Sequence, residues 1–195
     1  GTYYLHHASG QATAFLVTAQ GTIDYDPALD VPPGSTQGVF RGHGSTTLEL
    51  VGYTVTVDAT RPSHPQFFIP GVTNQWTTTQ TIVTFRLLPG AYTFQVAGAT
   101  YAFTVTQQGT IDYDATWDIH NPDIPGFLSG RGTVMIIFVG YNIQLDATAL
   151  TIDKFHLVSL NDWFNARQVQ GVHLLPAGYS LEFVAGMIDR IQFEV

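Results

Sequence analysis

The chain of 195 residues has a net charge of −8 and only seven Lys and Arg residues, so we expect no nucleic-acid partner, because such binding depends on clustered basic side chains. Hydrophobic residues make up 45% of the chain and are rich in Val, Ile, Phe and Tyr, which excludes a disordered protein. The best apolar run, 134–139, is far shorter than the about 20 residues of a membrane helix, and the absence of Cys excludes disulfides and thiolate sites.

Apolar and polar residues alternate along the chain, which predicts strands rather than helices. In segment 53–58, Tyr and Val face one way while Thr and Asp face the other. Glycine and proline punctuate the sequence about every ten residues, as in β-sandwiches and barrels. Only segment 160–168 is expected to form a short helical turn. The expected strands of the first half, which then recur in the second, are 3–7, 13–19, 21–26, 45–51, 53–59, 66–69, 80–88 and 91–97.

Two segments of the first half share an order of strand, glycine, tyrosine and strand. One is 48–57, with Gly52 before Tyr53, and the other is 85–96, with Gly90 before Tyr92. Because glycine tolerates backbone angles that other residues avoid, both are interpreted as two strands joined by a tight turn.

The strongest feature of the sequence is an internal duplication. Residues 21–26, Gly-Thr-Ile-Asp-Tyr-Asp, return letter for letter as residues 109–114. The match extends without gaps over 4–60 and 92–148, and it continues beyond them after a one-residue deletion. We therefore predict an all-β fold, an antiparallel β-sandwich or barrel built from two tandem repeats of about 88 residues with pseudo-twofold symmetry.

The duplication divides the chain into a first β repeat, 1–91, and a second, 92–178. Residues 179–195 resemble the hairpin that begins each repeat, as if a third copy started there. Two arrangements fit this pattern. The chain is cut from a longer array, or its first and last hairpins complete each other and close the fold as one domain.

Aspartates are retained in both repeats, although acidic residues are scarce in this chain. Carboxylates that lie close together can bind Ca²⁺, which takes several oxygen ligands. The alternative is structural, because Asp readily accepts hydrogen bonds from loop amides. The spacing departs from that of an EF-hand, and we favour the structural role over a calcium site; no other cofactor is expected. The candidate metal ligands are Asp24, Asp26, Asp30, Asp112, Asp114 and Asp118.

A second candidate site pairs Asn with Trp in predicted loops: Asn74 with Trp76, and Asn161 with Trp163 one repeat later. An exposed indole face can stack on a sugar ring while amides hydrogen-bond to its hydroxyl groups. The alternative is a Trp that closes the end of the core. Trp117, whose counterpart in the first repeat is a leucine, is assigned to the core or its rim.

The third candidate is a potential cation held between two glycines, His43 in the first repeat and Arg131 in the second. Flanking glycines permit close backbone approach, so these residues could face an anionic or hydroxylated ligand. The alternative is a bulge or turn that leads into the next strand.

Three functions remain compatible with these features. The leading hypothesis is a non-enzymatic, lectin-like module that binds a neutral carbohydrate, or another small molecule, through two equivalent sites. The second is a barrel enzyme of the cyclase or isomerase type with an apolar central cavity, and the third is a purely structural or adhesive β repeat. An extracellular location is favoured over others, no signal peptide is recognised in the sequence, and a homo-oligomer is left open.

Overall fold

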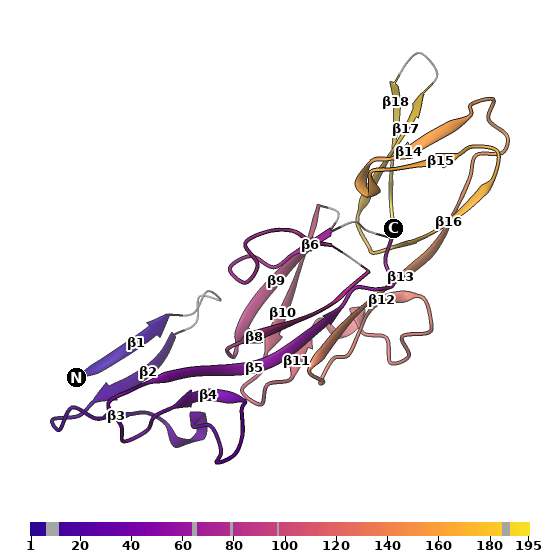
Figure 1. The fold of residues 1–195 in the computed structure, drawn as a ribbon. Coiled ribbons are helices and arrows are strands. Elements are labelled where there is room, and N and C mark those ends of the chain that lie inside the picture. The colour runs from indigo at the N-terminus through magenta and orange to yellow at the C-terminus, as the bar shows by residue number, and fades with distance from the viewer. Residues whose placement is uncertain (7–11, 64–65, 79, 97, 185–187) are drawn as a thin grey trace.

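The computed structural model describes residues 1–6, 12–63, 66–78, 80–96, 98–184 and 188–195, and the molecule is elongated (Figure 1). Strands dominate, and the helical content of the described residues is three short 3-10 turns. The N-terminal strands lie at one end of the molecule and the C-terminal strands at the other. The elements are β1 (Thr2–His6), β2 (Ala12–Val17), β3 (Ile23–Asp24), η1 (Pro27–Leu29), β4 (Gly38–Arg41), β5 (Glu49–Asp58), β6 (Gln66–Phe68), β7 (Thr77–Thr78), β8 (Ile82–Leu87), β9 (Gly90–Val96), β10 (Ala99–Val105), β11 (Ile111–Tyr113), η2 (Ala115–Trp117), β12 (Gly126–Ser129), β13 (Met135–Asp146), β14 (Lys154–Leu157), η3 (Val158–Leu160), β15 (Asp162–Asn165), β16 (Val169–Leu174), β17 (Gly178–Val184) and β18 (Ile188–Glu194).

The strands form four sheets, and none of them closes into a barrel within the described residues. Their orders are β1-β2-β3, β11-β10-β9-β6-β7, β12-β13-β5-β4 with β16 on β13 and β8 on β5, and β15-β14-β17-β18. All pairs are antiparallel except β5 with β13, where Met135–Ile137 run parallel to Thr56–Asp58. The predicted all-β character is confirmed.

The two long strands β5 and β13 change partners along their length. In β5, Gly52 pairs with Gly38 of β4, whereas Tyr53, the next residue, already pairs with Leu87 of β8. The expected tight turn at Gly52 is therefore wrong. Gly52 has a positive φ of 72°, which rotates the strand towards its second partner without ending it.

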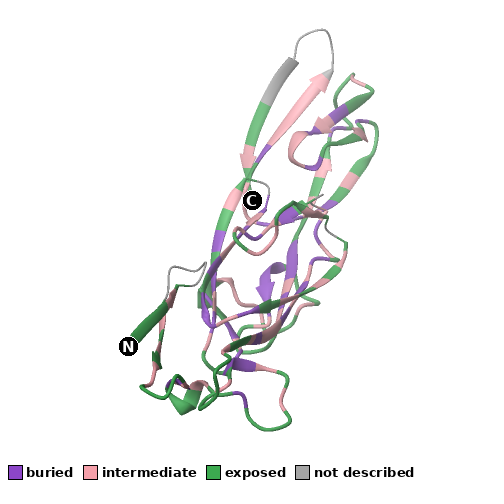
Figure 2. Ribbon diagram, turned by 60° about the vertical axis from the view of Figure 1, so that its left-hand side comes forward, coloured by how far each residue is buried: buried purple, intermediate pink, exposed green. Residues whose placement is uncertain are grey.

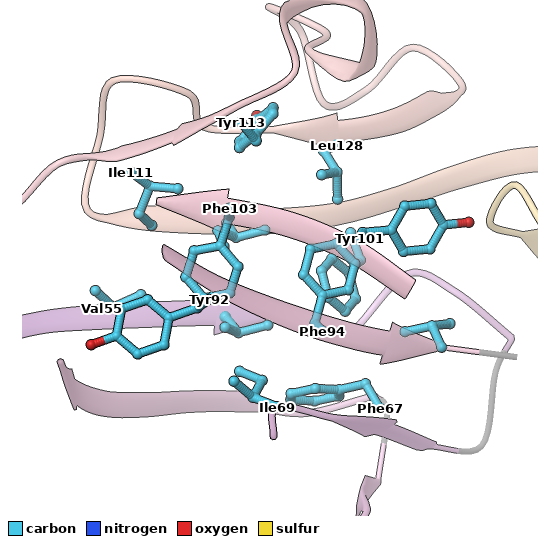
Figure 3. Close-up of a cluster of buried hydrophobic side chains, with 14 of the residues drawn as sticks. Val55, Phe67, Ile69, Tyr92, Phe94, Tyr101, Phe103, Ile111, Tyr113 and Leu128 are labelled. Carbon is cyan, nitrogen blue, oxygen red and sulfur yellow. The ribbon is translucent and has the colours of Figure 1, made fainter. Parts of the chain in front are cut away.

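The centre of the molecule is a pair of facing sheets that we call the middle module, residues 53–138. One layer is the five-stranded sheet; the other combines β12, β8 and the adjoining halves of β5 and β13. The space between them is filled by aromatic and aliphatic side chains (Figure 3). Phe94 lies centrally, with its ring centroid 5.2 Å from Tyr101 and 4.8 Å from Phe138. Burying each such side chain stabilises the fold by about 1.5–3 kcal/mol.

Flanking the middle module are an N-terminal unit, residues 1–52, and a C-terminal unit, residues 141–195. Each has a smaller core of its own, formed around Phe40 in the N-terminal unit and around Tyr179 and Phe155 in the C-terminal unit. Figure 2 shows that buried residues gather in the middle of the molecule, whereas exposed residues cover the N-terminal strand.

The helical turn expected at 160–168 is wrong. The chain instead ends the 3-10 turn η3 at Leu160, passes through Asn161 in the left-handed conformation with φ 54°, and enters strand β15. The apolar residues Trp163 and Phe164 favour a strand because each has a cross-strand partner on β14. Among the described residues, no helix combines the length and apolar character needed to cross a membrane.

Candidate functional site

The aspartates of the first half lie around β3 and η1, where each has a local partner. Asp26 begins η1 by accepting a 2.9 Å hydrogen bond from the Ala28 amide. Asp30 accepts a 2.6 Å hydrogen bond from the Tyr25 hydroxyl. Asp24 lies on the strand itself, with one carboxylate oxygen 2.8 Å from His43 Nε2. The three carboxylates are thus engaged in three different contacts.

The same three contacts recur 88 residues later. Asp114 accepts a 2.9 Å hydrogen bond from the Thr116 amide, and Asp118 accepts one of 2.6 Å from the Tyr113 hydroxyl. Asp112 accepts a 2.7 Å hydrogen bond from Arg131 Nε. The hydrogen bonds from Thr116 lower the pKa of Asp114, which keeps this turn-capping carboxylate ionised.

Each Tyr–Asp pair also fixes the backbone of a distant turn. The Tyr25 hydroxyl accepts a 3.0 Å hydrogen bond from the His43 amide, and the Tyr113 hydroxyl accepts one of 2.9 Å from the Arg131 amide. Burial, and then the hydrogen bond to Asp30, raise the pKa of Tyr25 to about 12. The phenol therefore stays protonated and can donate to the carboxylate while it accepts from the amide.

The described residues contain no group of three or more His, Asp or Glu side chains arranged to hold a metal ion. The calcium prediction is not tested by this observation and stays a prediction. The geometry supplies a structural role for the same carboxylates, because each already accepts a hydrogen bond or, for Asp24, lies within hydrogen-bonding distance of the His43 ring.

Gly42 and Gly130, the glycines that precede His43 and Arg131, are required by close backbone contacts. A Cβ on Gly42 would lie 1.9 Å from the Thr47 carbonyl oxygen, and one on Gly130 would lie 2.0 Å from that of Met135. Both turns thus bring two stretches of backbone together. His43 Nε2 lies 2.8 Å from Asp24 and Arg131 Nε lies 2.7 Å from Asp112, so the charge of Arg131 that could attract an anionic ligand is locally balanced.

Trp76 and Trp163 lie on the surface rather than over the end of a core. Their exposed fractions are 47% and 50%. Trp76 is tilted by 36° against Phe68, with ring centroids 5.5 Å apart. Trp163 stacks on His156, with centroids 4.8 Å apart and an interplanar angle of 15°. Each indole therefore has one face supported by a neighbouring ring.

Each Trp begins a row of side chains that crosses neighbouring strands. In the C-terminal unit, β14 pairs His156 with Trp163 on one side and with Glu182 on the other. His156 Nδ1 lies 3.3 Å from Glu182 Oε2, within hydrogen-bonding distance. We call Trp163, His156 and Glu182 the C-terminal row.

The middle module has a corresponding row, formed by Trp76, Phe68 and Gln95. Phe68 of β6 pairs with Gln95 of β9, and Trp76 directly precedes β7, the other neighbour of β6. Phe67 and Phe94, the neighbours of Phe68 and Gln95 in sequence, are buried. Because side chains alternate along a strand, the row lies on the outer surface of the sheet. We call it the middle row.

Asn74 and Asn161, predicted to accompany the two Trp residues, are both exposed. Asn161 ends η3 in the left-handed conformation, which Asn adopts more readily than most residues. Trp117 lies elsewhere, with its ring centroid 5.6 Å from Tyr101 and 5.4 Å from Phe127 at the edge of the middle core. Its assignment to the core or rim agrees with these contacts.

The predicted site residues fall into two groups that adjoin different strands. The aspartates with His43 and Arg131 surround the turns that follow β3 and β11, whereas the Trp residues adjoin β7 and β15. Sequence reasoning missed His156 and Glu182 as neighbours of Trp163. Period-two alternation together with the repeat offset, 88 residues for Phe68 and 87 for Gln95, could have aligned them with these two residues.

A scan of protein-family models found no match for this chain, and neither a curated protein nor a solved structure matches it. The functional interpretation therefore depends on the geometry of the chain itself.

Proposed function

We propose that the chain is a non-enzymatic binding module that holds neutral carbohydrate on two equivalent surface platforms, the middle row and the C-terminal row. The observation that carries the proposal is that Trp76 and Trp163 are each about half exposed and each in contact with a neighbouring ring. An indole of this kind offers a flat apolar surface to a sugar ring.

Hydrogen-bonding groups lie next to each platform. Gln95 ends the middle row and Glu182 ends the C-terminal row, and both are partly exposed. Asn74 and Asn161 are exposed two residues before each Trp. Amide and carboxylate groups of this type bind sugar hydroxyls.

The proposal includes the tandem arrangement of sandwich-like units predicted from the sequence. Three stacked aromatic pairs support it: Tyr3 with Phe15, Tyr92 with Phe103, and Tyr179 with Phe193. Their ring centroids lie 5.6, 5.5 and 5.5 Å apart, with interplanar angles of 22°, 24° and 26°. Each pair joins the two strands of a hairpin, and there is one such hairpin in each of the three units. Repeating units would present two weak sites to one multivalent surface.

The test is a screen against diverse immobilised glycans, followed by calorimetry with any oligosaccharide that binds. Trp76→Ala and Trp163→Ala should each remove one site, and on a multivalent surface the double variant should lose roughly 100-fold or more in apparent affinity. Quenching of Trp fluorescence by the soluble ligand provides a second measurement.

Matched controls are Ile82→Ala and Leu150→Ala, which replace exposed apolar residues away from the rows, one in the middle module and one in the C-terminal unit. Both should bind normally. Glycan binding that survives the double Trp substitution would remove the platforms from the proposal.

A second candidate is a structural or adhesive repeat without a saccharide ligand. It is favoured by the aspartates, which cap turns in the same way in both repeats. A second pair behaves alike, because Asp58 and Asp146 accept hydrogen bonds from the amides of Thr60 and Thr148, both 3.0 Å long. A glycan screen without any specific binder would favour this candidate over the first.

A further inference from the structure

The core of the middle module is closed by its own segment β11–β12 and the first half of β13. Phe138 of β13 lies with its ring centroid 5.7 Å from Phe67 and 4.8 Å from Phe94. Ile136 pairs in parallel with Val57 of β5. All five of these side chains are at most 1% exposed. We call residues 109–138 the cover of the middle module.

The C-terminal unit has the counterparts of the covered strands without a cover. Ile143 and Leu145, which correspond to Val55 and Val57, are only partly buried, and so is Leu181, which corresponds to Phe94. On one edge Gln144–Asp146 pairs with β16. Within the described residues, the other edge has no strand partner, although β5 uses the equivalent edge to bind β13.

The N-terminal unit shows the opposite arrangement of segments. Its residues 21–50 correspond to the cover, but the strands that a cover would close are lacking on that side among the described residues. Leu50, which corresponds to the buried Phe138, is 48% exposed. Residues 47–48 form no strand, whereas their counterparts Met135 and Ile136 do. The C-terminal end of the molecule thus has the strands on which a cover would pack but no cover. The N-terminal end has a segment that corresponds to the cover but not the strands on which it would pack.

We propose that the two ends bind each other between copies of this chain, head to tail, so that residues 47–50 of one copy lie beside Gln144–Asp146 of the next. This inference rests on the tandem arrangement included in the proposed function. Leu48 would run parallel to Leu145, as Ile136 does to Val57. Leu50 would fill the position that Phe138 occupies in the middle module.

The second sheet of this composite module needs an exchange of hairpins. Val105 of β10 pairs with Ile111 of the cover, and Val195 is the counterpart of Val105 at the end of the C-terminal unit. Ile23, the counterpart of Ile111, instead pairs with Val17 of its own β2. Before β3 can pair with the neighbouring copy, hairpin β1–β2 must therefore give up its own pairing with β3.

Hairpin β1–β2 is held to the rest of its unit by few contacts, although Leu5 and Phe15 pack against the N-terminal core. Four of the five residues of β1 are exposed, and only two residue pairs, Leu16 with Asp24 and Val17 with Ile23, join β2 to β3. Because the contact joins two different surfaces, it leaves a free end at each side of the pair and builds open chains rather than closed dimers. With a net charge of −8 on each copy, association should strengthen as salt screens the repulsion.

The first test is analytical ultracentrifugation of the full chain over a range of concentration and salt. We expect a series of oligomeric species whose size increases with protein concentration and with salt concentration. Leu50→Asp should leave the chain monomeric at concentrations where the unchanged chain associates. Ile82→Asp, at another exposed apolar position, should associate normally. A chain that stays monomeric at its highest soluble concentration, or a Leu50→Asp variant that associates normally, would overturn the proposal.

The second test uses the absence of Cys, so that any disulfide arises from introduced residues. Thr47→Cys combined with Gln144→Cys should give a ladder of covalent multimers on a non-reducing gel, because paired strands place Cα atoms within disulfide range. Thr56→Cys with Met135→Cys, an observed parallel pair, should link within one chain and shows that oxidation works. Thr47→Cys with Arg167→Cys should give no comparable ladder; equal ladders would contradict the specific pairing.

The third test locks the hairpin. Leu16→Cys with Asp24→Cys ties β2 to β3 in one chain, since these residues are direct partners. Oxidation should abolish association and reduction should restore it. Association that persists in the oxidised chain would exclude the hairpin exchange. Glycan binding by the Trp rows is measured separately on the same locked, monomeric chain, so failure of one proposal is distinguishable from failure of the other.

Discussion

The hydroxyl of Tyr113 donates a 2.6 Å hydrogen bond to the carboxylate of Asp118, and Tyr25 donates one of the same length to Asp30. Both phenols are buried. Each hydroxyl also accepts a hydrogen bond from an amide 18 residues further along the chain. One side chain thereby ties a strand, a 3-10 turn and a distant glycine turn together.

Tyr113→Phe removes both hydrogen bonds while it keeps the ring. The carboxylate of Asp118 is 11% exposed, so loss of its donor should lower the free energy of unfolding by about 1–3 kcal/mol. Urea denaturation followed by circular dichroism measures this change. Tyr141→Phe, at an exposed tyrosine, should alter stability little. Equal effects of the two substitutions would show that the hydroxyl of Tyr113 does not stabilise the turn.

Gly21 and Gly109 begin identical hexapeptides and have nearly identical φ angles of 80° and 79°. A Cβ on Gly109 would lie 2.1 Å from Cδ1 of Tyr53, whereas one on Gly21 would meet nothing within 4 Å. Gly21→Ala should therefore cost about 1–2 kcal/mol of backbone strain. Gly109→Ala should cost roughly 1–3 kcal/mol more, because Tyr53 must move. Thermal denaturation of both variants checks the difference, and equal losses would contradict the close contact.

The protein should lose stability in alkaline solution. Burial raises the pKa of Tyr25 and Tyr101 to about 12, and it raises the pKa of Tyr53, Tyr92 and Tyr179 above the ordinary value. Above about pH 10 the unfolded chain releases phenolic protons that the folded chain still holds, so stability falls as pH rises from there. Denaturation at pH 8 to 12, with tyrosinate absorbance recorded in parallel, should show ionisation and unfolding together. Constant stability up to pH 12 would contradict this linkage.

Calcium should have little effect on stability if the aspartates act as turn caps and ion-pair partners. We expect the same melting temperature in a chelator and in excess Ca²⁺, because Asp26 and Asp114 are already engaged by amides. A rise in melting temperature that grows with calcium concentration would instead show binding to the folded state. Asp112→Asn and Asp24→Asn would then identify the repeat that binds.

Much of the strand content could be predicted because it follows local periodicity. Segments expected at 91–97 and 66–69 appear as β9 and β6 with boundaries within about two residues. The tight turn expected at Gly52 was wrong. A glycine in the sequence indicates that the backbone can adopt a positive φ, but it does not indicate whether the chain reverses direction there. A strand that passes from β4 to β8 depends on partners that lie far away in the sequence.

The candidate site, like the fold, could be predicted from the sequence only in part. The repeat offset, 88 residues for the aspartates and 87 for the tryptophans, identified which of them correspond, but it could not show which neighbours surround them. His156 supports Trp163 because β14 and β15 pair in one particular register, and nothing near His156 in the sequence indicates that register. The exposure of Trp76 likewise depends on which face of the sheet is turned away from the core.

Because β5 and β13 each belong to two neighbouring units, the chain has no slack linker at either junction. A pulling force applied to the two ends would pass along these continuous strands into the middle module. There the parallel pairing of Thr56–Asp58 with Met135–Ile137 would be loaded in shear, so that several hydrogen bonds must break at once. Fraying of one unit would also remove a strand from its neighbour, which couples their unfolding. The three units are therefore joined by continuous strands, in contrast to domains joined by flexible linkers.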